Sequence, residues 1–461
     1  MLNWIWMAMI VVGVFVAALL GQLSGSNGIV EGMFQMVKIG VVSIVIPLSA
    51  IMMLWLGIMR LAETSGFVTY LARAVRPVMR LLFPDVPKDH PAMGAMVMNM
   101  AANMLGLGNA ATPLGLKAMQ HLDELNPNKG TATNAMCMFL AINTSSVTLI
   151  PATAIGLLAA QGIAQPYAIV STTILATLVS TTVAIISVKL LERLPVFQKS
   201  LEPISVEETD SEQEAAGPRL KRIGPLGVSL LLTALLAFAG VVLLEANPSM
   251  RNSLQETLGL ADVAAQLDAE GASLDELPEE NPPAWQRWVM SVSVTAIPFV
   301  LVFFLIFAAL RGVRVYEEFV EGAKEGWAVA VRIMPFIVAM LAALAIFRNS
   351  GTLFLIQEWL RPFLDLVRFP PDLVPMALMR PLSGSGSQGV LVDILTNEGI
   401  SATVKYAAAT MFGSTETTFY VLAVYFGSVA VRRTRHALAA GLCADFAGVI
   451  AAVFICKALF G

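Results

Sequence analysis

Charged residues are scarce in this 461-residue chain: they occupy 13% of positions, whereas hydrophobic residues occupy 57%. Soluble globular domains carry about 25% charged residues. Together with a mean hydropathy of +0.74, this scarcity predicts an all-α polytopic membrane protein, because only helices or closed barrels satisfy the backbone within lipid. The formal net charge of −4 accompanies no basic patch with interleaved aromatic residues, so we expect no nucleic-acid partner.

Cysteine and histidine are also rare, with three of each. The cysteines lie far apart in apolar runs and form neither a CxxC pair nor a disulfide framework (Cys137, Cys443 and Cys456). The histidines do not have metal-ligand spacing, and no phosphate-binding GxxxxGK[ST] or zinc-binding HExxH motif occurs. We therefore expect no bound metal, no cofactor and no enzymatic activity.

Long apolar runs are what the sequence does have. Nine stretches are long enough to cross a bilayer: 3–20, 36–59, 135–160, 166–190, 225–245, 288–310, 328–347, 403–431 and 437–459. Two others, 91–119 and 372–396, are interrupted by Gly, Pro, Asn and Ser, which predicts discontinuous segments folded as helical hairpins. We therefore expect roughly 9–11 membrane segments, since each span needs about 20 residues.

Two hydrophilic connections divide the chain. Residues 191–223 carry an acidic run at 207–214 and are expected to form a cytoplasmic linker. Residues 246–287 are acidic and contain four prolines, which indicates an insertion outside the membrane. The predicted domains are a first repeat (1–190), the linker (191–223), a linking helix with the insertion (224–287) and a second repeat (288–461).

Lysine and arginine near the span ends predict the topology. The richest segments are expected on the cytoplasmic side: 60–90, 191–223, 311–332 and 432–436. The poorest, 21–35 and 246–287, are expected outside. At the matching span ends, Arg60 and Arg348 are expected to extend their charged groups toward the membrane surface.

The two halves share an ordered series of anchors, which indicates an internal repeat. The pairs are Pro47 and Pro335, Gly66 and Gly351, Pro77 and Pro362, Pro84 and Pro370, the glycine turns 105–109 and 383–387, and the polar runs 143–148 and 414–419. With the predicted topology, the matching spans 36–59 and 328–347 run in opposite directions. Inverted repeats with paired broken segments are typical of secondary transporters, whose site lies between the repeats.

Small polar residues gather at these interruptions and form our candidate substrate or ion site. In the first half they are Asn103, Asn109, Thr112, Asn143, Thr144 and Ser145; in the second they are Ser383, Ser385, Ser387, Gln388, Ser414, Thr415, Glu416 and Thr417. Pro113 is expected to begin the second helix of the first hairpin. Helix N-termini at the hairpin tips offer free N–H donors to an anionic group.

Glu416 is the strongest candidate because a carboxylate buried in a span costs at least about 2.5 kcal/mol. It is expected to bind a substrate amine, a coupling cation (Na⁺) or a proton. Asp445, within the last span, is a weaker candidate. The alternative for the Ser and Thr residues is that their hydroxyls bond to backbone carbonyls or pack helices together.

Several of these stretches resemble a known family. The first half, with 84–119 and 141–151, resembles spore maturation protein A, and the second half, with 379–395, 413–427 and 432–442, resembles spore maturation protein B. Each half is similar to Gate, or nucleoside-recognition, domains. The resemblance implies a fused, multi-pass protein of the bacterial inner membrane with helical hairpins. Gate regions of iron transporters place Cys near the glycine turn, whereas residues 106–109 contain none, which disfavours ferrous iron.

The functional prediction is an ion-coupled secondary transporter or exporter of a small polar solute, either nucleoside-like, an amino acid or a carboxylate. The expected partners are the lipid bilayer, the solute and a coupling H⁺ or Na⁺, and a homodimer is compatible with this interpretation. Two alternatives stay open: a non-transporting membrane scaffold for an envelope process, and a cation channel.

Overall fold

The computed structural model describes residues 2–25, 28–106, 108–145, 147–198, 223–263 and 283–461. The acidic run at 207–214, residues 264–282 of the acidic insertion and the side chain of Asn109 lie outside this description. The described residues are almost all helical, and their one isolated β-bridge joins Thr131 to Arg433.

The first half contains helices α1 to α10, together with a short π-helix before α3 and a short 3₁₀-helix before α9. They are α1 (Leu2–Leu20), α2 (Ile29–Ile39), the π-helix η1 (Gly40–Val45), α3 (Ile46–Thr64), α4 (Phe67–Leu82), α5 (Pro91–Met104), α6 (Gly108–Glu124), α7 (Asn134–Ser145), α8 (Ala152–Ala160), η2 (Pro166–Ala168), α9 (Ile169–Leu191) and α10 (Pro195–Gln198).

The linking region and the second half follow the same order of long, broken and hairpin segments. They comprise α11 (Pro225–Ala246), α12 (Pro248–Thr257), α14 (Ala284–Leu310), α15 (Val315–Asn349), α16 (Thr352–Leu366), η3 (Pro371–Leu373), α17 (Val374–Met379), α18 (Gly384–Thr396), α19 (Ala402–Ser414), α20 (Thr418–Ser428) and α21 (Ala437–Phe460).

Within the described ranges, six helices are long and apolar enough to cross a membrane: Ile46–Thr64, Pro166–Leu191, Pro225–Ala246, Ala284–Leu310, Val315–Asn349 and Ala437–Phe460. The chain is therefore a multi-pass membrane protein. The predicted first span is a shorter apolar helix, Trp6–Leu20. The predicted spans 135–160 and 403–431 are not continuous helices, because each is interrupted where its Ser/Thr-rich run begins. Such side chains compete for backbone hydrogen bonds, and proline cannot donate one.

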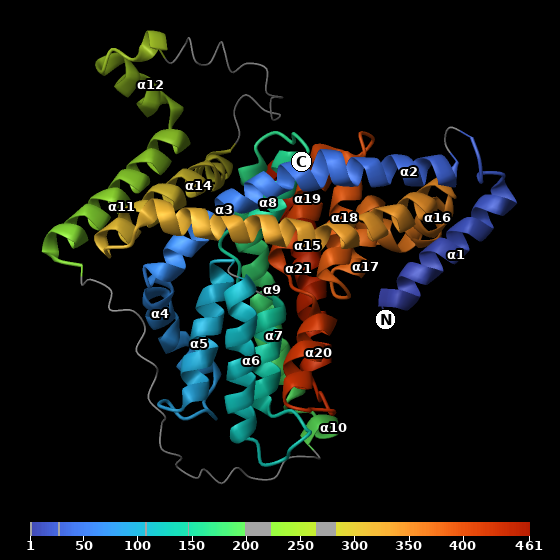
Figure 1. Cartoon of the computed structure of the whole chain (residues 1–461), viewed down its shortest axis with the longest axis horizontal. Helices are drawn as coiled ribbons and strands as arrows, with labels where there is room; N and C mark the ends of the chain where they lie inside the picture. Colours follow the sequence, from blue (N-terminus) through green and yellow to red (C-terminus); the bar gives the residue numbers. More distant parts are fainter. Residues whose placement is uncertain (1, 26–27, 107, 146, 199–222, 264–282) are drawn as a thin grey trace.

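The longest helix, α15, lies antiparallel along α2, η1 and α3, as Figure 1 shows. Gly32 at the start of α2 contacts Asn349 at the end of α15, whereas Gly57 near the end of α3 contacts Phe319 near the start of α15. A Cβ on Gly326 would lie 2.6 Å from the Met53 backbone, so glycine permits this close approach. The equivalent spans therefore run in opposite directions, which confirms the inverted repeat.

Local geometry supports the same pairing of the halves. Gly66 and Gly351, which precede α4 and α16, both adopt left-handed backbone angles, with φ of 77° and 81°. Pro77 and Pro362 both lie inside the helices that follow. These two anchor pairs thus occupy the same structural positions in both halves.

The second set of equivalent helices, α9 and α21, pack against each other and against α7 and α19. In Figure 1 these helices, with α5, α6 and α20, form a bundle that crosses the α3–α15 layer steeply. One continuous hydrophobic core contains residues from both halves. The linking helix α11 lies at the edge, and only 11% of its apolar window is buried.

Contacts between loops agree with the predicted sidedness. Arg311 donates to the Ser65 carbonyl at 3.0 Å, and Arg435 donates to the Phe197 carbonyl. These bonds join segments that the charge distribution places on one side of the membrane. Arg60 is predicted to extend its charged group toward the membrane surface. In the structure its guanidinium forms ion pairs with Glu318 at 3.2 Å and with Glu325 at 3.4 Å.

Candidate functional site

The polar interruptions of the two halves meet at the centre of the molecule. We call the interval between α7 and α8 the first break, of which residues 147–151 are described, and residues 415–417, between α19 and α20, the second break. The Glu416 N–H of the second break donates to the Thr144 carbonyl, at the end of α7, at 2.7 Å. A carbonyl freed by the end of one helix thus accepts a donor from the opposite repeat.

The first break and the start of α20, just after the second break, are each bound to the hairpin tip of their own half. The Leu149 N–H donates to the Met104 carbonyl at the end of α5, at 3.0 Å. The Phe419 N–H donates to the Pro381 carbonyl between α17 and α18, at 3.1 Å. These equivalent bonds satisfy backbone groups that irregular structure would leave unpaired in a membrane.

The first hairpin turns at Gly106, which has a φ of 73°. The prediction that Pro113 begins the second helix is wrong, because α6 already starts at Gly108 and contains this proline in its interior. Asn109 therefore belongs to the first turn of α6, and Thr112 is half-buried just beyond it.

The other candidates of the first half are engaged within the protein. Asn103 donates to the Asn143 side-chain oxygen at 2.9 Å, and Asn143 donates to the Phe139 carbonyl at 2.8 Å. The hydroxyls of Thr144 and Ser145 donate to carbonyls of their own helix. Two asparagines thus join the hairpin to α7, whereas the hydroxyls satisfy local backbone groups, as the packing alternative predicts.

The candidates of the second half surround the start of α18. The Gly386 N–H donates to the Ser383 hydroxyl at 3.0 Å, a helix cap. The remaining polar side chains lie close by: Ser385 at 3.4 Å from the Ser383 hydroxyl, Ser387 bonded to the Ser383 carbonyl, Gln388 half-buried, and Ser414 and Thr415 bonded to the Met411 carbonyl. A Cβ on Gly384 would lie 3.2 Å from the Thr417 hydroxyl, so α18 and α20 begin side by side.

The sequence predicts a buried Glu416, and this prediction is wrong. Its side chain is 51% exposed. Its backbone is held by Thr144, and α20 begins two residues later, so the side chain points away from the packed helices. Its carboxylate lies 3.9 Å from the guanidinium of Arg380, which is 4% exposed. Arg380 also donates to the Thr415 carbonyl and lies 4.7 Å above the Phe412 ring.

Comparison with known proteins agrees with this two-part architecture. The Gate family model, described as nucleoside recognition, matches residues 45–161 and 330–432. The chain is 45% identical over 186 residues to spore maturation protein A of Bacillus subtilis, covering 40% of this chain and 93% of that protein. It is 41% identical over 170 residues to spore maturation protein B of the same bacterium, covering 37% and 96%.

The chain belongs to the spore maturation protein A/B family. Among solved structures it is similar to the Alcanivorax borkumensis YdaH transporter, at 14% identity and a TM-score of 0.46, covering 99% of this chain and 96% of that one. Each Gate match contains one hairpin tip and one break, whereas α21 lies beyond both matches.

Another central carboxylate of this family member is Asp445, the weaker candidate from the sequence. Asp445 in α21 is 2% exposed, and its Oδ2 accepts a hydrogen bond from the Thr418 hydroxyl at 2.5 Å. Gly441 and Gly448 flank it on the same helix face, and their small size allows contact with Thr418 and Thr415, respectively. The spacing Gly441, Asp445, Gly448 is the sequence signal that identifies this face.

A buried ion pair in the spore maturation protein B-like half is not predicted from the sequence. Arg348 was expected to reach the membrane surface, but it pairs with Asp393 of α18 at 2.5 Å. The Asp393 side chain is 3% exposed. This pair ties the end of α15 to the helix that begins at the second hairpin tip.

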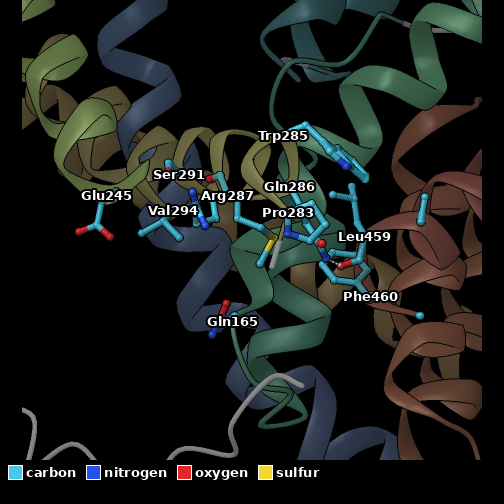
Figure 2. A pocket seen from close by; sticks show the side chains of 13 residues that line it. Gln165, Glu245, Pro283, Trp285, Gln286, Arg287, Ser291, Val294, Leu459 and Phe460 are labelled. Atoms are coloured by element: carbon cyan, nitrogen blue, oxygen red, sulfur yellow. Dashed lines mark hydrogen bonds between the residues drawn. The ribbon is translucent and has the colours of Figure 1, made fainter. Parts of the chain in front are cut away.

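A cavity of about 580 Å³ lies away from the breaks. It is formed where α11 ends and α14 begins, near the last residues of α21, and Figure 2 shows Glu245, Arg287 and Phe460 around it. None of the predicted site residues whose side chains the structure describes lines it. The candidate site is therefore the contact between the breaks and not this cavity.

Proposed function

We propose that this protein is an ion-coupled secondary transporter of a small polar solute in the bacterial cytoplasmic membrane. The observation that carries the proposal is the bond between the Glu416 N–H and the Thr144 carbonyl, at 2.7 Å, where broken helices from opposite repeats meet. Broken helices at a repeat interface are the usual place for a transported solute. Rocking one repeat against the other would break or remake this contact.

The charges at the second break favour a solute that carries both a carboxylate and an amine, such as an amino acid. The Arg380 guanidinium and the starts of α18 and α20 attract a carboxylate. The half-exposed Glu416 attracts an ammonium group. A nucleoside has no charge that complements either group, so we place it behind zwitterions and carboxylates.

The proposal is tested by a thermal-shift screen of amino acids, dicarboxylates and nucleosides, followed by flux into proteoliposomes of the compound that stabilises the protein most. Glu416→Gln should reduce uptake at low solute concentration about tenfold, because losing about 1.4 kcal/mol of binding weakens affinity by that factor. Glu358→Gln, which removes a partly exposed carboxylate paired with Arg361 on α16, is the matched control.

Two results would contradict this proposal. One is that none of the screened compounds stabilises the protein. The other is equal flux for the wild type and Glu416→Gln. Flux of inorganic cations without a saturable organic solute would support the channel alternative.

A further inference from the structure

Asp445 is placed where a charged side chain is costly. It belongs to α21, one of the six helices that can cross the membrane, and is 2% exposed. A carboxylate at such a depth costs at least about 2.5 kcal/mol, and residues of this kind commonly line ion and proton paths. Packing alone would be served better by an apolar residue of similar size.

Its helix face touches the end of α7, just before the first break, and also touches the second break. A Cβ on Gly441 would lie 3.4 Å from the Thr144 hydroxyl, and one on Gly448 would lie 2.6 Å from Thr415. Because Asp445 lies between these glycines, one turn from each, any rearrangement of the two breaks changes its surroundings. Asp445 is therefore a buried acid beside the contact that alternating access would open and close.

The hydrogen bonding of the Asp445 carboxylate suits a proton. Oδ2 accepts from the Thr418 hydroxyl, while Oδ1 is buried and has no hydrogen-bond partner among the described residues. One free oxygen is enough to form an O–H bond with a proton delivered by water. A hard metal cation instead requires about six oxygen ligands.

The charges that face Asp445 come from the second half. Arg380 from the hairpin tip and Glu416 from the second break both act on it electrostatically. Of the helices packed against α21, α7 has no Asp, Glu, Lys, Arg or His, α20 has only Tyr420 and Tyr425 as titratable groups, and Lys189 and Lys405 lie near the far ends of α9 and α19. Arg380 is thus the cation that offsets the ionised Asp445.

We infer that Asp445 binds the coupling proton of this transporter, a role that rests on the proposed function. When a solute carboxylate binds to Arg380, it neutralises the guanidinium charge. Arg380 then no longer stabilises the ionised form of Asp445. A proton from water then bonds to Oδ1, and the carboxylate becomes a neutral acid. Release of the solute frees the Arg380 charge to stabilise the ionised Asp445 again, and the proton leaves to water.

The test is a pH titration of purified protein in lipid, followed by infrared difference spectroscopy of the protonated-carboxyl C=O band, with no solute added. Asp445→Asn should remove one titrating band, whereas Glu416→Gln and Glu358→Gln should retain it. Asp393→Asn identifies any band that belongs to the Arg348 pair. A full set of titrating bands in Asp445→Asn overturns the inference.

A second variant keeps the inference testable where Asp445→Asn does not fold. Thr418→Val has nearly the same shape and removes the hydroxyl that donates to Oδ2. The band of the protonated acid should move to higher frequency, because its carbonyl loses a hydrogen bond, and an unmoved band overturns the inference. Since no solute is present, a band that is lost with Asp445 upholds proton binding even where the Glu416→Gln flux test fails.

Discussion

The three acidic residues near the centre are alike in chemistry but differ in solvent exposure and in the partner of each carboxylate. Glu416 is half-exposed beside Arg380, whereas Asp445 is enclosed with Thr418 and Asp393 with Arg348. All three are carboxylates within or beside apolar stretches of the sequence. Their environments differ because each depends on a partner that is distant along the chain. The partner of each carboxylate therefore determines which acid is exposed to water and which is enclosed.

His436, which precedes α21 and lies outside the membrane-spanning helices, leads to a prediction about the pH dependence of stability. Burial, together with Arg435 and Lys189, lowers the pKa of His436 from its usual 6.5 to about 4. The unfolded chain therefore takes up a proton at a pH at which the folded protein does not. Stability should fall as the pH is lowered from about 6.5 to about 4, by up to ~3 kcal/mol.

The measurement is thermal unfolding in detergent at a series of pH values. His436→Gln should flatten the pH dependence relative to the wild type. His121→Gln, at a partly buried histidine paired with Glu124, is the matched variant at a site apart from Arg435 and Lys189. An equal slope for the wild type and His436→Gln would show that another group controls acid stability.

Elements depend on close helix contacts as well as on hydrophobic length. The antiparallel pair of α3 and α15 is the scaffold from which both hairpins extend. Glycines on α15 allow its backbone to approach α3, as at Gly326 against Met53. Dispersion and packing, more than hydrophobic exclusion, stabilise such contacts in lipid. Small changes of volume here should therefore have large effects.

Gly326→Ala should destabilise the protein by about 1–3 kcal/mol, because the added Cβ would lie 2.6 Å from the α3 backbone. The matched control is Gly240→Ala in α11, where an added Cβ meets nothing within 4 Å. That change should be neutral or stabilising by up to about 1 kcal/mol, since alanine favours helix. Melting temperatures in detergent measure both, and a shift of the same sign for both variants would contradict the α3–α15 contact.

At the scale of the whole molecule, the two halves form one structure. Buried residues of both belong to the same hydrophobic core, and α9 packs along α21. The relatives are separate A and B proteins, each matched over nearly its full length by part of this chain. Fusion therefore joins two units that are built to pack together.

Residues 1–198 and 223–461 produced as separate chains in one cell should assemble into a stable complex. The reason is that the contacts between α9 and α21, and between α3 and α15, do not need the connecting segment. Copurification on a tag carried by one half is the measurement. Residues 1–198 alone should be unstable in detergent, and a monodisperse isolated half would argue against a shared core.

Much of this architecture follows from local sequence. Clusters of Gly, Pro and Ser/Thr break the helices near Gly106, near Ser383 and at both breaks, so the hairpins and the positions of both breaks are predictable. The repeated order of these clusters predicts the two inverted halves. Local rules fail in part at Pro113, because a proline inside a helix costs only one backbone bond and a kink.

Only the tertiary structure decided how the charges are arranged. Arg348 with Asp393, Asp445 with Thr418, and Arg380 with Thr415 each join residues that are 27 to 45 positions apart. The energy of a charge within a membrane depends on the partner and on water access, and neither is recorded in the neighbouring sequence. The sequence by itself therefore determined the broken, inverted helices, and the fold decided which carboxylate faces water and which is enclosed between them.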